Sequence, residues 1–282
     1  MIYLLLSVCA SVLVVSYFKL FERFQVDVLQ AIVVNYVTCS IMGNLMSDKP
    51  IVTTAFYLEP WFPYTLVLGF LFISIFYCIA QTAQKVGVSI SMVAAKLSVA
   101  IPVLFAVMVH HEDLGLYKAL GILLSLIAVY FISSMQAGGN AAKYWYLPLL
   151  VFAGSGCIDT LLTIINKQFI PPGDTNSILS VVFLTACVLG ALLMAILRIK
   201  ISLKSWLWGV ALGVPNYFSM YFLLKTLQSF QESSIALPMN NIAILMSTAL
   251  VGWVFFKEQL SVKKIIGLSL AIVSIVILSL YQ

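Results

Sequence analysis

The chain has 282 residues, of which 62% are hydrophobic and only 9% are Asp, Glu, Lys or Arg, and its net charge is +5. Soluble domains carry about 25% charged residues, so this composition excludes a protein that covers its surface in water. The small and dispersed positive charge also argues against nucleic-acid binding. What remains is an integral membrane protein, and its length suits about ten helical spans with short loops.

Apolar runs bounded by charged residues, proline or glycine predict the spans in chain order. The first run lacks the positive start and the small-residue cleavage site of a signal peptide, so we interpret it as a span. None of the connections is long enough to form a soluble domain. The predicted spans are 2–18, 28–46, 63–83, 87–109, 115–135, 145–165, 176–197, 205–224, 233–255 and 262–281.

The second half of the chain repeats part of the first. Residues 111–125 resemble residues 257–271, and a shorter match lies just upstream in both halves. The matched positions include Glu112 with Glu258, Gly121 with Gly267, and Ser89 with Ser234. Because the offset of about 145 residues covers five spans, an odd number, the second half must enter the membrane in the opposite sense. We therefore predict an all-α membrane fold of ten helices in two inverted five-helix repeats, residues 1–136 and 144–282.

An acidic residue follows the fourth and the ninth predicted span, within "HEDLG" at residue 111 and "KEQLS" at residue 257. Together with ten spans in two halves, these motifs resemble the EamA-type transporters of the drug/metabolite transporter superfamily, along essentially the whole chain. The glycine before the acid in the family's GE-x-L signature is absent at both places. The resemblance implies a ten-helix transporter whose third, fourth, eighth and ninth spans line a central substrate cavity. It also implies that both termini lie in the cytoplasm.

The charges in the loops predict a different orientation. The loops after the odd-numbered spans and the adjoining span ends carry ten Lys and Arg residues, against four on the other side. The positive-inside rule therefore places the termini outside the cytoplasm, whereas the resemblance places them inside. The orientation stays open between the two. In either orientation we expect a multi-pass protein of the plasma membrane, which in a bacterium is the inner membrane.

One charge stands deep inside the fourth predicted span. Lys96 lies eight residues after Val88, which is about 12 Å along a helix and too far for comfortable snorkelling to the surface. A charge at this depth costs about 2.5–3.5 kcal/mol on insertion scales. Lys96 is therefore either a cation that faces a cavity and binds an anionic group or exchanges a proton, or a structural ammonium paired inside the protein.

The repeat gives Lys96 a counterpart in the ninth span. At an offset of 145 residues, Lys96 corresponds to Asn241 and its neighbour Ala95 to Asn240, within "PMNN". Inverted-repeat transporters build their substrate site from such related points near the middle of the membrane. The alternative for the two asparagines is a hydrogen bond between helices. Asp159 in the sixth span is a candidate counter-ion for Lys96 or proton carrier, or else a structural partner of a hydroxyl.

Other polar residues within the spans are weaker candidates for the cavity wall. "GVPNYF" around Pro215 suggests a broken eighth helix that exposes polar groups. The residues concerned are Asn35, Tyr77, Gln81, Asn216 and Tyr217.

No catalytic, metal or cofactor site is expected. The cluster "HHED" at residues 110–113 cannot direct four adjacent side chains at one ion, and phosphate-binding or hydrolase motifs are absent. We predict a secondary transporter that moves a small metabolite with an anionic group across the bilayer by alternating access, with the proton as a candidate coupling ion. The alternative is a non-transporting membrane scaffold in which Lys96 belongs to a structural ion pair; a membrane-embedded enzyme or a channel has less support.

Overall fold

The computed structural model describes residues 2–47, 56–109, 115–134, 143–169, 175–229, 233–259 and 262–280, and within them the regular structure is entirely helical. The first part of the chain forms α1 (Ile2–Arg23), α2 (Val28–Leu45), the short 3-10 helix η2 (Phe56–Leu58), α3 (Phe62–Lys85), α4 (Val88–Leu97), α5 (Ala100–Val109) and α6 (Leu116–Ser134). The second part forms α7 (Tyr146–Phe169), α8 (Thr175–Ile196), α9 (Leu203–Ser229), α10 (Ser233–Val254) and α11 (Val262–Leu280).

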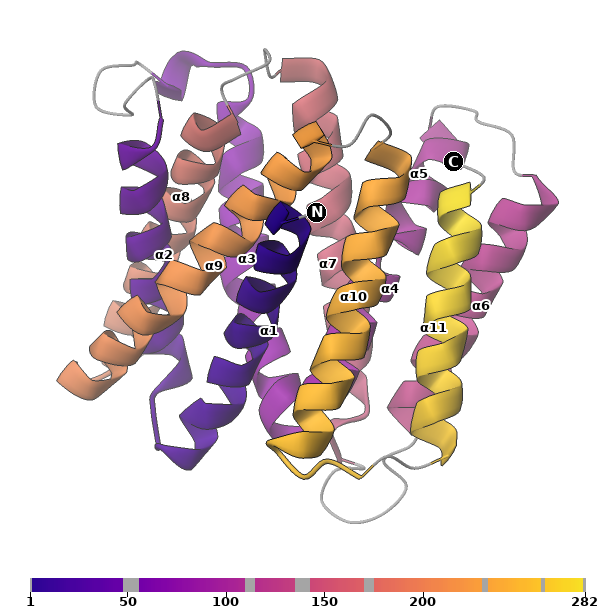
Figure 1. Cartoon of the computed structure of the whole chain (residues 1–282). Coiled ribbons are helices and arrows are strands. Elements are labelled where there is room, and N and C mark those ends of the chain that lie inside the picture. Colours follow the sequence, from indigo (N-terminus) through magenta and orange to yellow (C-terminus); the bar gives the residue numbers. More distant parts are fainter. Residues whose placement is uncertain are drawn as a thin grey trace.

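The long helices run side by side and in alternating directions, so that the start of α1 and the end of α11 lie on the same side of the bundle (Figure 1). Within the described residues, four helices are long and apolar enough by themselves to cross a membrane: Ile2–Arg23, Val28–Leu45, Phe62–Lys85 and Ile178–Ile196. The composition and these helices identify an integral, multi-pass membrane protein.

The predicted fourth span, residues 87–109, is not one helix. It is broken at Ser98 and Val99 into α4 and α5, and the prediction of a continuous span was therefore wrong. Pro102 explains the break, because it has no N–H to donate to the carbonyl of Ser98 four residues earlier. That carbonyl instead accepts a hydrogen bond from the N–H of Ile101, at 2.9 Å.

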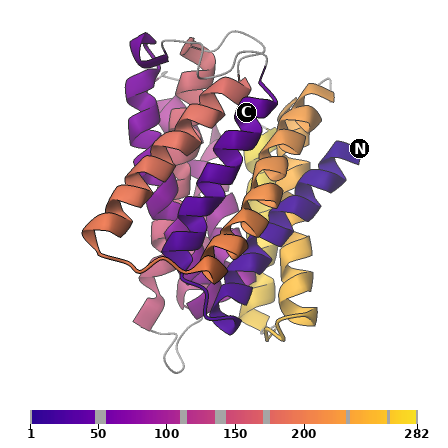
Figure 2. The same ribbon diagram turned by 90° about the vertical axis from the view of Figure 1, so that its left-hand side faces the viewer.

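The expected break in the eighth span is also wrong, because α9 runs without interruption through Pro215. A proline inside a membrane helix is tolerated where neighbouring helices hold the segment in place. Here α9 packs along both α1 and α2, and Figure 2 shows α1 lying between α9 and α10. This packing keeps the helix continuous despite the missing backbone hydrogen bond.

Helices from the two parts of the chain pack mainly on each other: α2 on α8 and α9, α3 on α7 and α8, and α6 on α11. The centre of the first group is aromatic. The Tyr36 ring stacks on that of Phe183, with centroids 5.8 Å apart, and its hydroxyl donates to the carbonyl of Phe72 at 2.8 Å. This hydrogen bond leaves the fully buried phenol satisfied.

Two glycines spaced four residues apart set the contact between α9 and α2. A Cβ atom on Gly209 would lie 2.7 Å from the backbone oxygen of Ala31, and one on Gly213 would lie 3.0 Å from that of Asn35. Small residues at this spacing let membrane helices approach closely. This close approach also brings polar side chains of the two helices into contact, among them Asn35 and Asn216.

We expect Gly209→Ala to destabilise the protein by about 1–3 kcal/mol, the usual cost of overpacking. Alanine favours a helix over glycine by about 1 kcal/mol, so the loss arises from the clash with α2 alone. Gly115→Ala is the matched control, because nothing lies within 4 Å of a Cβ atom there. Thermal unfolding of the purified variants measures both. A transition for Gly209→Ala at or above the wild-type temperature would contradict close packing at this point.

Candidate substrate-binding site

The break between α4 and α5 brings a hydroxyl and a carboxylate together in the middle of the bundle. Ser98, at the end of α4, is fully buried, and its Oγ lies 3.1 Å from Oδ2 of Asp159 and 2.7 Å from the carbonyl oxygen of Ala95. Asp159 stands near the midpoint of α7. The pair therefore lies at the depth where a membrane-spanning segment is farthest from water.

Glycines on α7 allow this close approach. A Cβ atom on Gly154 would collide with the side chain of Ile75 on α3, and one on Gly156 with that of Ile101 on α5. Both glycines therefore belong to a face of α7 that packs closely against other helices. Gly156, one turn before Asp159, lets α7 approach the start of α5 next to Ser98.

Lys96 lies on the same part of α4. Its side chain is half-buried, and it lies two residues before Ser98, which contacts Asp159. Among the described residues, no ion pair shorter than 4.0 Å joins the Lys96 ammonium to a carboxylate. The Asp159 side chain is exposed although it contacts Ser98.

The two asparagines of α10 differ in burial. Asn240 is 1% exposed, and its Oδ1 has no hydrogen-bond partner among the described residues, whereas Asn241 is half-buried. An unsatisfied buried acceptor costs about 1–3 kcal/mol. Helix α10, which carries Asn240, packs against α4, which carries Lys96. Asn240 therefore places a buried hydrogen-bond acceptor on a neighbour of the Lys96 helix.

Asn35, Asn216 and Tyr217 form a second polar cluster, between α2 and α9. The Asn216 amide donates to Oδ1 of Asn35 at 3.1 Å and lies 3.4 Å from Sγ of Cys39. All three predicted residues are buried, and within the described part of the chain Nδ2 of Asn35 and the hydroxyl of Tyr217 lack hydrogen-bond partners. The structure thus joins these predicted residues to one another. It places them on helices other than α4 and α7, which carry Lys96 and Asp159.

The two candidates on α3 stand apart from both clusters. Tyr77 is 40% exposed, and Gln81 is half-buried one turn later. Sequence reasoning missed Ser98 and Cys39, which complete the two clusters. Pro102 is the signal that would have pointed to Ser98, because a proline frees the carbonyl four residues before it.

A further contact joins the two parts of the chain at one end of the bundle. The Glu258 carboxylate accepts hydrogen bonds from the N–H of Val88, at 2.6 Å, and from the hydroxyl of Ser89, at 2.9 Å. We call this contact the Glu258 clasp. It caps the first turn of α4 from the segment that follows α10, so a carboxylate meets the positive end of a helix.

Two glycines make room for the clasp. Gly87 has a φ of 142°, which side chains rarely adopt, and a Cβ atom there would lie 3.0 Å from Oε1 of Glu258. A Cβ atom on Gly252 would lie 2.7 Å from both Oε2 of Glu258 and Oγ of Ser89. The clasp therefore depends on small residues from both parts of the chain.

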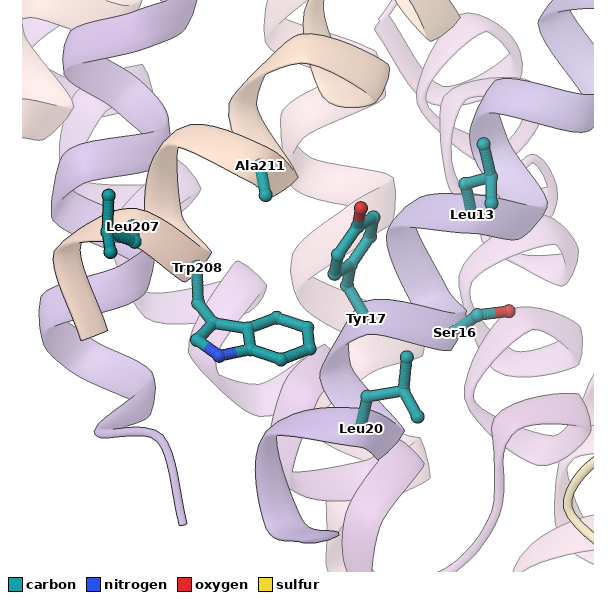
Figure 3. A pocket seen from close by; sticks show the side chains of 7 residues that line it. All are labelled: Leu13, Ser16, Tyr17, Leu20, Leu207, Trp208 and Ala211. Atoms are coloured by element: carbon teal, nitrogen blue, oxygen red, sulfur yellow. The ribbon is translucent and has the colours of Figure 1, made fainter. Parts of the chain in front are cut away.

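The described hollows lie elsewhere, on the outer side of α1. One, of about 430 Å³, lies between α1 and α9, where Figure 3 shows Tyr17 and Trp208 facing each other. Another, of about 780 Å³, lies between α1 and the end of α10. Both are mainly apolar, and Lys96 and Asp159 line neither.

The cluster at residues 110–113 lies outside the described residues, and so does Glu112, the sequence counterpart of Glu258. Within the described ranges, no group of three His, Cys, Asp or Glu side chains is placed to hold a metal ion.

Comparison with known proteins agrees with this architecture. A crystal structure covering 99% of this chain and 96% of its own shares the fold, with a TM-score of 0.62 and 17% identity. An uncharacterized protein of Haemophilus influenzae is 28% identical over 92% of this chain and 90% of its own length. Residues 147–280 match the EamA-like transporter family. This is a family of small-molecule transporters and not of enzymes, and over the second half of the chain the match confirms the resemblance to EamA-type transporters of the drug/metabolite transporter superfamily.

Proposed function

We propose that this protein is a secondary transporter of a small metabolite that bears a carboxylate or another anionic group. It moves this metabolite by alternating access, and Lys96 is the positive pole of its binding site. The observation that carries the proposal is the broken helix at Ser98, which leaves Lys96 and an exposed Asp159 in the middle of the bundle. Interrupted helices at this depth are typical of substrate sites in secondary transporters.

The groups around the break favour a substrate with both an anionic and a hydrogen-donating part. Lys96 supplies donors for a carboxylate. The unpartnered Oδ1 of Asn240 on the adjoining α10 supplies an acceptor, and so does the Asp159 carboxylate. An amino acid carries a carboxylate and an ammonium donor, and a hydroxy acid carries a carboxylate and a neutral hydroxyl donor. Asp159 is also the candidate for a coupling proton, because it is a carboxyl group within the bundle beside the break.

The contacts of α10 support movement between the two parts of the chain. α10 packs on α4, next to the Glu258 clasp, whereas α5 packs mainly on α6 and α7. The contacts between α10 and the broken span are therefore concentrated on α4, the half of the span next to the Glu258 clasp. Opening the clasp end and closing the α5 end would expose the Lys96 region to the opposite side of the membrane.

The scaffold hypothesis has less support. A structural ion pair that replaces a binding site would be short and enclosed, because buried charges need close partners to offset their desolvation. Among the ion pairs of the described residues, none joins Lys96 to Asp159 within 4.0 Å, and Asp159 is exposed. Both features fit a site that exchanges partners.

The proposal is tested by a thermal-shift screen of amino acids and organic acids on the purified protein, followed by uptake into proteoliposomes. A ligand at one hundred times its Kd stabilises the folded state by about 2.7 kcal/mol. We expect the stabilising compounds to carry a carboxylate and to be taken up above the level of empty liposomes. Each compound that stabilises the protein is compared with the analogue in which an uncharged amide replaces the carboxylate. Stabilisation and uptake of the amide to the same extent would contradict a cationic site.

A further inference from the structure

Two apolar grooves adjoin on one face of α1. The groove toward α10 is walled by Val12, Leu13 and Leu20 of α1 and by Val251, Phe255 and Phe256. The groove toward α9 is walled by Tyr17, Leu207, Trp208 and Ala211 (Figure 3). Leu13, Ser16 and Leu20 line both grooves, so the two hollows lie next to each other along the helix.

Cations stand at one end of the groove toward α10, where α1 ends. Lys19, Glu22, Arg23 and Lys257 all line it. Lys19 donates to the carbonyl of Gln84 at 2.8 Å and pairs with Glu22. Glu22 is also paired with Lys85, at 3.7 Å, so its charge is already shared by two lysines.

Arg23 and Lys257 are the other two cations at this end of the groove. Both side chains are exposed, and neither has an ion pair with another described residue. The Arg23 guanidinium lies 5.9 Å from the centre of the Phe24 ring, and that ring stacks on Trp208 at 5.0 Å. Trp208 belongs to the second groove, so the aromatic contact links the cationic end of one groove to the wall of the other.

We propose that this face of α1 binds an anionic phospholipid with two acyl chains. Its phosphate lies between Arg23 and Lys257, and one acyl chain occupies each groove. The two cations without a partner carboxylate favour an anionic headgroup over a zwitterionic one, because each basic residue near an anionic lipid contributes about 1 kcal/mol, or about fivefold in affinity. Trp208 suits the boundary between chains and headgroup, where indole rings concentrate. This site is independent of the proposed transport.

The test compares phosphatidylglycerol with phosphatidylcholine of the same acyl chains, added to the full-length protein and measured by native mass spectrometry and thermal shift. We expect phosphatidylglycerol to bind at least about tenfold more tightly. The double variant Arg23→Gln/Lys257→Gln should lose about twenty-fold in affinity for phosphatidylglycerol and little for phosphatidylcholine. Arg198→Gln/Lys204→Gln is the matched control, since both are exposed cations outside the two grooves. It should change neither affinity more than twofold.

A third variant tests the grooves separately from the charges. Ser16→Phe adds bulk where the two grooves adjoin, and we expect it to weaken binding of both lipids while leaving the preference for phosphatidylglycerol intact. Equal binding of the two lipids by the wild type, or equal losses in the two double variants, would overturn the headgroup site. Lysophosphatidylglycerol, with one chain, binding as tightly as phosphatidylglycerol would overturn the two-chain arrangement.

Discussion

Replacing Lys96 by methionine should reduce uptake of the transported substrate at least about thirty-fold while the protein still folds. Removing one member of a desolvated charge contact with a ligand costs about 2–5 kcal/mol, and 2 kcal/mol is about thirty-fold in affinity. Methionine keeps most of the side-chain volume, so α4 loses the charge and little of its packing. Initial rates of uptake into proteoliposomes, normalised to folded protein, measure the effect. Lys204→Met, at an exposed position, is the control and should transport normally.

A double variant separates a binding role of Lys96 from a structural one. If Lys96 only balanced the charge of Asp159, then Lys96→Met/Asp159→Asn would restore both folding and transport, because it removes both charges together. We expect the double variant to fold as well as the wild type and still fail to transport. Recovery of transport in the double variant would refute the assignment of Lys96 to the substrate.

Loss of the Glu258 clasp should loosen the first turn of α4 and slow transport about tenfold or more. A hydrogen bond to a charged group contributes about 1.5–3 kcal/mol. Glu258→Ala removes the acceptor from the N–H of Val88 and from the hydroxyl of Ser89, which weakens the closed arrangement at that end of the bundle. A transporter that cannot return to one of its two states turns over slowly.

Hydrogen exchange measures the clasp directly and without any substrate. We expect peptides that cover the start of α4 to exchange about tenfold faster in Glu258→Ala, while peptides from α2 and α8 keep their wild-type rates. Glu258→Gln keeps an acceptor for Val88 and should have a smaller effect. Glu22→Ala is the matched control, because Glu22 pairs with Lys19 and Lys85, both within the first part of the chain. Unchanged exchange at α4 would refute the clasp even if transport fell.

Much of the fold follows from hydropathy, because apolar runs of span length have few other solutions in a membrane. The exceptions concern proline. Average hydropathy along the chain does not depend on whether a residue has a backbone N–H. The break caused by Pro102 before α5 was therefore missed. At Pro215 the missing hydrogen bond predicted a break, but packing of α9 on α1 and α2 keeps the helix continuous.

The candidate site was predictable in its residues but not in its pairings. Lys96 and Asp159 stand out because charges are rare in such runs. Their relation through Ser98 depends on how closely α7 approaches the break, which the glycines of α7 set in three dimensions. Asn35 and Asn216 were each singled out, yet their contact spans 181 residues of sequence. Glu258 was recognised as the acid of a repeated motif, and its partners on α4 come from the other part of the chain.

The break at Ser98 also changes the electrostatics of the membrane interior. An unbroken span has its partial charges only at the two surfaces, whereas a span cut in the middle creates a negative helix end and a positive helix end within the bilayer. Lys96 lies in the last turn of α4, at its negative end, and Asp159 meets Ser98 just before α5 begins. The Lys96 charge therefore faces the negative end of the α4 dipole, an interaction worth about 0.3–2 kcal/mol. The backbone can thus compensate part of the Lys96 charge within the bilayer.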